Sequence, residues 1–297
     1  MFINGCDCSL VIKTEHQEMS IPYSDETIRE AVTILREEAT IEGKGVYRGL
    51  RKISGVTGCV VTPLTIETAP LLLCLAMGTS SIPVYVSETR NIYRSELYLV
   101  PMENTEQFAL IQDRSGNNEQ IAKSNEKKLF EDCRVASFEL RILRNEIVKL
   151  KLDVTSERPH VVYPYNDREQ RIETGERFYG DNVTYTINGQ EYKNIYGVTI
   201  TSKKVNGTKT ELWIKRIKEQ GDDIPAIIEE MTITATLSRD RYEHYYYGTF
   251  QLNLTNLFLV CDESNINAPD AVIGPMRYFV IGFTSATVFS TSRVAIV

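Results

Sequence analysis

Hydrophobic and polar residues alternate along much of this chain in short runs, and this spacing predicts a protein built mainly of β-strands. In residues 146–154, charged side chains separate Leu150, Leu152 and Val154 from one another. A period of two gives a strand one buried face and one solvated face. Similar runs, bounded by Gly, Asn, Asp or Pro, lie at residues 96–100, 137–142, 182–187, 191–195, 197–204, 209–217, 231–238, 245–254 and 278–289.

Tight turns join several neighbouring runs into predicted β-hairpins. Asn188-Gly189 and Asn206-Gly207 each stand between two alternating runs. Asn-Gly favours the type I′ turn because both central positions of that turn need a positive φ angle. Arg144-Asn145 is a further candidate for a two-residue turn, and it predicts a hairpin over residues 133–154.

Signals for helices are few. Thr68 can cap a short helix that has Pro70 in its first turn and Gly78 just after its end. The segment between them, APLLLCLAM, is apolar on every side, so this helix is expected to be buried against a sheet. A second short helix is predicted at residues 223–230, whereas residues 28–37 are compatible with either a helix or a strand.

Two polar stretches predict long loops. Residues 113–128 are polar apart from two residues and so have few apolar side chains to hold them down, and we expect this loop to become ordered only on assembly. Residues 155–180 have the charge and proline content of a linker. A boundary there would divide the chain into two β-rich halves, 1–158 and 159–297, and the alternative is a single elaborated domain over residues 1–297.

The charge balance argues against a dedicated nucleic-acid-binding protein. The chain of 297 residues has a net charge of −7, so it lacks the basic footprint by which proteins hold phosphates. No secretory signal is visible, and no apolar run approaches the roughly 18–20 residues that span a bilayer. We therefore expect no membrane partner.

The cysteine pattern predicts free thiols in a reducing cytoplasm. The chain contains six cysteines: Cys6, Cys8, Cys59, Cys74, Cys133 and Cys261. The first two form a C-x-C pair, and no second pair stands nearby to complete a zinc site. The other four lie in apolar surroundings and are expected to be buried.

Residues for catalysis are not apparent, and we predict no catalytic, cofactor-binding or metal-binding residue. His16, His160 and His244 do not stand at metal-ligand spacing from one another or from a cysteine pair. The sequence contains neither G-x-S-x-G nor a phosphate-binding P-loop. Adjacent acidic residues are predicted to be solvated surface groups: Glu37-Glu38, Asp222-Asp223 and Glu229-Glu230. The sequence therefore predicts a protein that is not an enzyme and needs no cofactor.

An aromatic cluster is the most unusual local feature of the sequence. It consists of Tyr242, Tyr245, Tyr246, Tyr247 and Phe250. We interpret it as strand or interface packing, because tyrosine is favoured in both settings. A stacking platform for sugars is the alternative. That alternative would make the chain a ligand- or carbohydrate-binding β-sandwich module of a virion or cell surface.

The order of three segments resembles the phage tail tube protein (major tail protein) family. In residues 56–78 an extended strand leads through a threonine-proline turn into a short Leu/Ala helix that ends in Gly. In residues 129–154 a C-x-V-x-S-F strand is followed by a tight turn and a strand that ends in Asp. Residues 274–294, GPMRYFVIGFTSATVFSTSRV, resemble a closing strand of the same family.

The resemblance implies a tail-tube-like β-sandwich or half-barrel with a short flanking helix and long loops, similar also to the type VI secretion tube protein. Six copies would form a ring, or three copies if each chain holds the fold twice. The rings would stack into a hollow tube whose lumen passes DNA without specific binding. The implied partners are further copies of the chain and other tail proteins, such as the tape measure, tail tip or terminator. The implied location is the virion tail, assembled in the cytoplasm of a bacterial host.

Other functions stay open at the level of the sequence. Besides the ligand-binding module, these are an enzyme and another virion part of the same fold, such as a tail terminator or baseplate hub protein. The enzyme would be a glycoside hydrolase or a β-rich hydrolase with dispersed carboxylates. The resemblance does not tell which strand face would line a lumen.

Overall fold

The computed structural model describes residues 9–15, 17–41, 44–87, 92–113, 127–163, 175–204, 206–217, 224–237, 248–262 and 273–290. Of these, it gives the backbone alone for 33–51, 87, 162, 163, 262, 273, 274, 284 and 290. The described strands are β1 Ser9–Lys13, β2 Glu18–Ile21, β3 Asp25–Glu26, β4 Arg29–Ile41, β5 Lys44–Pro63, β6 Gly78–Ser80, β7 Val84–Ser87, β8 Ile92–Leu99, β9 Phe108–Asp113, β10 Lys127–Leu143, β11 Lys149–Ser156, β12 Val161–Tyr163, β13 Val183–Ile187, β14 Gln190–Glu191, β15 Ile195–Lys203, β16 Lys209–Ile217, β17 Ile227–Thr236, β18 Thr249–Asp262 and β19 Ile273–Ser290. The helices are α1 Ala69–Met77 and the short 3-10 turns η2 Met102–Asn104 and η3 Gly180–Asn182. The predicted mainly β fold with a short helix is confirmed.

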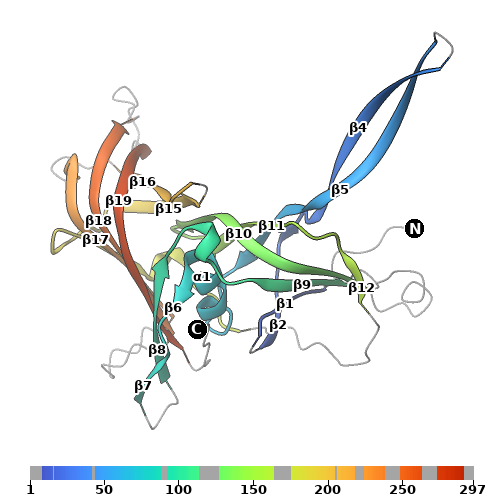
Figure 1. Ribbon diagram of the computed structural model, residues 1–297. Coiled ribbons are helices and arrows are strands. Elements are labelled where there is room, and N and C mark those ends of the chain that lie inside the picture. Colours follow the sequence, from blue (N-terminus) through green and yellow to red (C-terminus); the bar gives the residue numbers. More distant parts are fainter. Residues whose placement is uncertain are drawn as a thin grey trace.

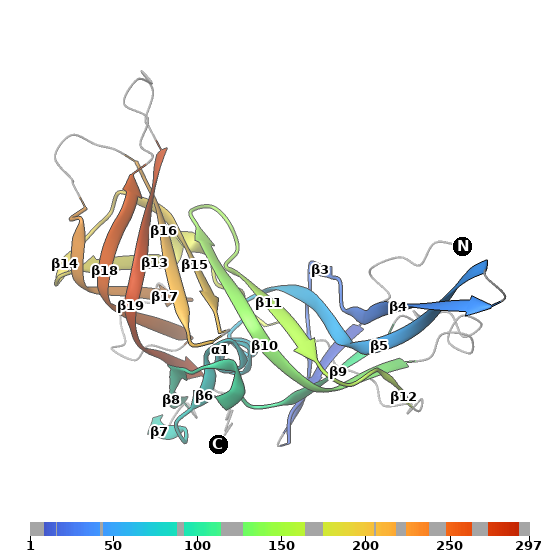
Figure 2. The same cartoon turned by 45° about the horizontal axis from the view of Figure 1, so that its top comes forward.

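The strands form one large antiparallel sheet (Figures 1 and 2). Its main path runs β14-β13-β17-β18-β19-β16-β15-β10-β11-β5-β4. One branch leaves β19 through β8 to β6 and β7, and another leaves β10 through β9 and β1 to β2. Among the described strands this path does not return to its starting strand, so they form a sheet that is not closed into a barrel.

The alternation expected for residues 146–154 is present in β11. Leu150, Leu152 and Val154 are almost completely buried, while Lys151 and Asp153 face solvent and form an ion pair at 3.4 Å. β11 pairs on one side with β10 and on the other with β5. The period of two in the sequence therefore fixes which side of this central strand contributes to the core.

The predicted turns are also confirmed. Asn188 and Gly189 have φ angles of 49° and 80°, and Asn206 and Gly207 have 54° and 104°, as type I′ turns require. In the turn between β10 and β11, Asn145 has φ 62° and the Glu146 N–H donates to the Leu143 carbonyl at 3.1 Å. Each turn sets the register of the strands that it joins.

Helix α1 occupies the predicted segment, and every one of its residues is buried. Gly78 ends the helix with φ 114°, a left-handed conformation that glycine adopts readily. Thr68 precedes the helix without a side-chain hydrogen bond to its first turn. Its hydroxyl instead accepts a hydrogen bond from the Thr65 N–H at 3.2 Å, which stabilises the turn that leads into the helix.

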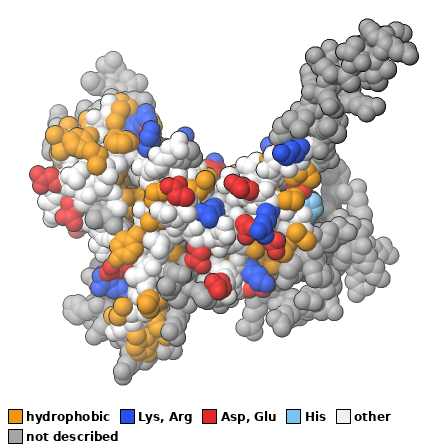
Figure 3. Space-filling model, viewed as in Figure 1, with side chains coloured by type: hydrophobic (Ala, Val, Ile, Leu, Met, Phe, Trp, Pro, Cys, Tyr) orange, Lys and Arg blue, Asp and Glu red, His pale blue; other side chains and the backbone are white. Residues whose placement is uncertain are grey.

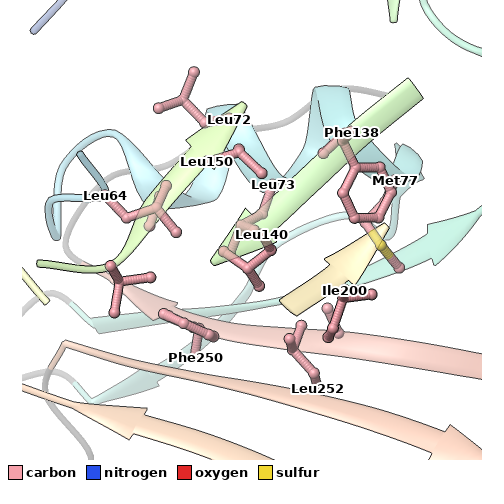
Figure 4. Packing of buried hydrophobic residues seen from close by; sticks show 14 of the residues in the cluster. Leu64, Leu72, Leu73, Met77, Phe138, Leu140, Leu150, Ile200, Phe250 and Leu252 are labelled. Atoms are coloured by element: carbon pink, nitrogen blue, oxygen red, sulfur yellow. The ribbon is translucent and has the colours of Figure 1, made fainter. Parts of the chain in front are cut away.

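The core lies between α1 and the sheet (Figure 4). The helix contributes leucines and Met77, which face Phe138 and Leu140 of β10 and Phe250 and Leu252 of β18. These side chains are 5% exposed or less. The helix therefore covers one face of the sheet, and it brings together strands that lie more than a hundred residues apart in the chain.

Two expectations about local structure need correction, and one alternative that the sequence left open is decided. The helix expected at residues 223–230 is wrong, because β17 begins at Ile227 and buries Ile228 in the core. Residues 28–37 are extended, since β4 begins at Arg29. The linker expected at residues 155–180 is interrupted by β12 and by Phe178, whose ring packs edge-on against Phe250 at 5.0 Å.

The two sequence halves share one sheet and one buried cluster. β10 pairs with β11 of the first half and with β15 of the second half, over Ser137–Leu143. The buried cluster likewise contains residues from both halves. Whether 1–158 and 159–297 are subdivisions of one domain stays a prediction.

Candidate assembly surfaces

A β-hairpin made by β4 and the first part of β5 projects from the body of the molecule (Figures 1 and 2). Its strands pair from Arg29↔Thr57 to Ile41↔Lys44. From Val56 onward β5 also pairs with β11, whereas in the described part of the chain residues 44–55 pair with β4 alone. We call residues 29–55 the projecting hairpin.

The projecting hairpin has a physical cost in a monomer. Two strands without further neighbours are marginally stable in water, and their outer edges leave backbone N–H and C=O groups without strand partners. A third strand or a packed surface from another molecule would satisfy those groups. The hairpin is therefore a candidate contact between subunits of an assembly.

The root of the projecting hairpin is held by specific contacts. The Nδ1 atom of His160 lies 2.7 Å from Oε1 of Glu30, and both side chains are partly buried. Gly55 has φ 134°, and a Cβ there would lie 2.1 Å from the Ser156 carbonyl oxygen. Glycine therefore permits the close crossing at which the hairpin leaves the sheet.

A polar pocket of about 380 Å³ opens beside this root. Glu30, Gln112, Lys128 and His160 line it together with Phe130, whose ring lies 6.1 Å from the histidine ring. His160 thus binds a carboxylate next to the hairpin. In the described residues, no group of three or more His, Cys, Asp or Glu side chains could hold a metal ion.

An apolar patch covers one end of β17, β18 and β19 on the side opposite the core. We call it the outer apolar patch, and it consists of Ile227, Phe258, Val260, Phe279 and Ile281, which are 58%, 40%, 58%, 38% and 65% exposed. The strand register places Phe258 between Ile227 and Phe279. Figure 3 shows the hydrophobic side chains gathered at the upper left, over these strands. Contiguous exposed apolar surface of this kind is typical of a protein–protein interface.

An ordered charged rim borders the outer apolar patch. The Arg277 guanidinium donates to both carboxylate oxygens of Glu211, at 2.5 and 3.2 Å, and lies 5.1 Å from the centre of the Trp213 ring. A bidentate pair that also stacks on an aromatic ring is held in a defined geometry. An apolar centre with a polar rim is the usual anatomy of an interface.

β7 is a second exposed apolar element. Val84, Tyr85 and Val86 are 62%, 44% and 44% exposed, so apolar side chains project from both faces of the strand. In the described part of the chain β7 pairs with β8 alone, and Tyr85 packs against Tyr93 with ring centres 5.2 Å apart. A strand of this kind at a sheet edge can pair with a strand of another molecule.

Lys204 is a buried cation that the sequence did not reveal. Its side chain is fully buried, and Nζ donates to the Leu75 carbonyl at the C-terminal end of α1 at 3.4 Å. Burial lowers the pKa of this amine to about 7, and the nearby Cys74 thiol counteracts that shift. The neighbouring residue, Lys203, is exposed. Two adjacent lysines in a strand–turn sequence carry no signal that one of them is buried.

The thiols behave as expected only in part. Cys74 and Cys133 are buried, and burial raises the pKa of each thiol to about 12, which keeps it protonated and unreactive. Cys59 and Cys261 are free but half-buried, so the expectation of full burial is wrong for them. Both lie on long strands, where alternate side chains face the outside.

Several residues that the sequence singled out lie outside the described residues: Cys6, Cys8, His16, Tyr242, His244, Tyr245, Tyr246, Tyr247 and residues 114–126. The carbohydrate-binding alternative based on the tyrosines therefore stays a prediction, as does ordering of the 113–128 loop on assembly. Phe250 of the aromatic cluster is fully buried in the core. None of the helices in the described residues has the length and apolarity needed to cross a membrane.

Comparison with known proteins adds no relative. No protein-family model matches the chain. A search of curated proteins likewise finds no match. The interpretation therefore rests on the described surfaces: the projecting hairpin, the outer apolar patch and the β7 edge.

Proposed function

We propose that this chain is a structural virion protein that assembles into stacked rings and forms the tail tube of a tailed phage. The resemblance of residues 56–78, 129–154 and 274–294 to tail tube proteins supports the proposal. The predominance of antiparallel strands agrees with it. The rings would contain six chains, or three if each chain counts as two copies of the fold.

The projecting hairpin is the observation that carries the proposal. It extends a two-stranded ribbon into solvent, where a monomer gains little stability from it (Figure 1). Against a neighbouring subunit the same ribbon would offer free backbone edges for pairing. A hairpin with this geometry is expected in a protein whose working state is an assembly.

The exposed apolar elements give the proposal further support. The outer apolar patch and β7 lie at different places on the sheet. Two separate apolar surfaces suit a subunit with more than one neighbour. Contacts of one kind would close a ring by rotation, and contacts of a second kind would stack the rings along an axis.

The first test is the assembly state of the purified full chain. We expect rings or hollow tubes by negative-stain electron microscopy, and a mass by light scattering that is several times 33.8 kDa. Their rotational symmetry gives the number of chains in a ring. A protein that remains monomeric at high concentration, even after a tail-tip complex is added, would contradict the proposal.

A variant with a shortened hairpin tests directly whether the projecting hairpin is needed for assembly. Residues 34–51 are replaced by Asn-Gly, so that Thr33 and Lys52, which are partners in the native strand register, flank a tight turn. We expect circular dichroism and the melting temperature to change little, while rings and tubes are lost. Normal tubes from this variant would show that assembly does not require the hairpin.

The outer apolar patch has a matched pair of variants. Phe258→Asp places a charge in the middle of the patch and is expected to reduce assembly at least tenfold, because a buried unpaired charge is costly at an interface. Lys209→Asp introduces the same side chain at an exposed position of β16 and serves as the control. Equal assembly of the two variants, measured by light scattering, would exclude the patch as a subunit contact.

A further inference from the structure

The sheet face opposite the core carries, next to the outer apolar patch, an array of uncharged polar side chains. We call this array the polar face, and it consists of Thr184, Thr186, Thr232, Thr234, Gln251, Asn253, Ser285 and Thr287. The strand register aligns them in two rows across β13, β17, β18 and β19. One row runs Thr184–Thr234–Gln251–Thr287, and the other runs Thr186–Thr232–Asn253–Ser285. In Figure 3 the surface below the apolar patch is largely white, the colour of backbone and of side chains other than hydrophobic and charged ones.

Hydrogen bonds within β18 and between strands hold this array together. The amide oxygen of Asn253 accepts from the Thr232 hydroxyl at 3.3 Å and from the Gln251 amide at 3.1 Å. The Asn253 amide nitrogen donates to the Ser285 hydroxyl at 3.4 Å. Donors and acceptors thus satisfy one another across three strands, which reduces what they gain by binding a ligand.

The charges around the polar face are mainly acidic. Glu191 stands opposite Thr186, Glu96 opposite Thr287, and Glu230 opposite Thr255. Arg94 also lies at this rim, and its guanidinium forms an ion pair with Glu96 at 2.5 Å. A phosphate that approaches this face therefore meets hydroxyl and amide groups surrounded by carboxylates.

We infer that the polar face lines the lumen of the assembled tube and faces the duplex nucleic acid that passes through it. The inference rests on the proposed function. Helix α1 and the core cover the other face of the same strands, so that face cannot meet solvent in a ring. If the sheets of neighbouring subunits join edge to edge, the uncovered polar face is the one available to line the channel.

The composition of the polar face favours passage of a DNA duplex over its retention. Proteins gain most of their sequence-independent affinity for DNA from Lys and Arg, which release counterions from the phosphates. In the described residues of the polar face, no side chain is cationic. The acidic rim adds weak repulsion at a range of about one Debye length, roughly 8 Å at physiological salt. A duplex would therefore slide along this surface without being held.

The test introduces lysines on the polar face and asks whether tubes then trap DNA inside. Thr186→Lys with Gln251→Lys places two cations on the face at positions that are not cross-strand neighbours. The matched control, Asn104→Lys with Gln107→Lys, adds the same charge at exposed positions beside η2. Tubes of each variant are incubated with a short DNA duplex, sedimented and treated with nuclease.

We expect polar-face lysine tubes to retain at least tenfold more duplex than unsubstituted tubes, in nuclease-resistant form. Control tubes should bind DNA that remains digestible. Digestible DNA on the polar-face variant as well would place that face outside the tube and overturn the inference, while leaving the proposed function intact. Unsubstituted chains that remain monomeric in the electron microscope, even after a tail-tip complex is added, would overturn both. Saturable glycan binding that is lost in Asn253→Ala would assign the face to a sugar-binding module instead.

Discussion

Lys204 lies beneath the C-terminal end of α1, in a region where the surrounding core leaves its amine little contact with water. Burial disfavours the charged form, so the pKa of the amine falls from 10.5 to about 7. The position has a structural use, because a donor at this place satisfies a carbonyl at the end of the helix. Because the pKa differs between the folded and unfolded states, the stability of the fold depends on pH.

The direction of this pH dependence follows from proton counting. Between about pH 7 and pH 10.5 the unfolded chain keeps the proton on Lys204 and the folded chain does not. The free energy of unfolding therefore gains a contribution that rises with pH across this window and is absent below about pH 7. We expect Lys204→Met to remove this contribution, so the difference in melting temperature between pH 9.5 and pH 7 should become smaller than in the unsubstituted protein.

The control for this prediction is the neighbouring lysine. Lys203→Met changes an exposed side chain and should leave the pH dependence unaltered. A profile of Lys204→Met that superimposes on that of the unsubstituted protein would contradict the assigned burial of the charge. Differential scanning calorimetry over the pH range gives the comparison.

At the scale of single residues, the sequence predicted the turn positions and failed at the buried cation. Asn188, Gly189, Asn206 and Gly207 were identifiable because a positive φ angle is a local requirement that few residue types meet. Burial of Lys204 depends on α1, which approaches from residues 69–77. No local sequence pattern shows that α1 will pack over Lys204.

At the scale of elements, strands and hairpins were predictable because their signals are local. The exception is the stretch before β17, where Pro225 suggested a helix start. In the structure its carbonyl accepts a hydrogen bond from the Tyr278 hydroxyl at 3.0 Å, and the strand begins two residues later. Pairing with β18 and β13, which no local pattern shows, decides the conformation there.

The two Asn-Gly hairpins allow an element-scale test of backbone strain. A Cβ added at Gly189 or Gly207 meets no atom within 4 Å, so substitution changes conformational preference and little else. We expect Gly189→Ala and Gly207→Ala each to lower the free energy of unfolding by about 1 kcal/mol, because alanine disfavours positive φ angles. Chemical denaturation measures the change.

Gln190→Ala is the matched control for Gly189→Ala, because it alters an exposed neighbour without touching the strained position. It should change the free energy of unfolding by less than about 0.5 kcal/mol. Equal losses in the two variants would show that the turn geometry is not what Gly189 provides.

At the scale of the whole molecule, the sheet joins both halves of the sequence. Cutting the chain after residue 158 would expose the edge of β15 and divide the buried cluster. We expect the full chain to unfold in one cooperative transition, and the separate fragments 1–158 and 159–297 to show none. Calorimetry and near-ultraviolet circular dichroism of the three proteins test this. A fragment that melts cooperatively on its own would instead establish two domains.

The whole-molecule arrangement was beyond prediction from the sequence. The branch at β10, which pairs with β11, β15, β9 and β12, depends on contacts between distant segments. The candidate surfaces were equally hidden: Phe258 and Phe279 become neighbours only through the β18–β19 register. The sequence predicted that Phe250 would pack in a strand or interface, but not that it would meet Phe178 in the core.

The projecting hairpin also has a kinetic consequence. A two-stranded ribbon has little stability of its own, so much of the entropic cost of fixing it falls on the moment when it docks. The first ring forms with this loss of entropy and without the stabilising contacts of a stacked layer. A subunit that adds to an existing end, in contrast, docks on a preformed surface. Assembly of the free protein should therefore show a lag phase and a threshold concentration, and a small amount of preformed seed should abolish the lag.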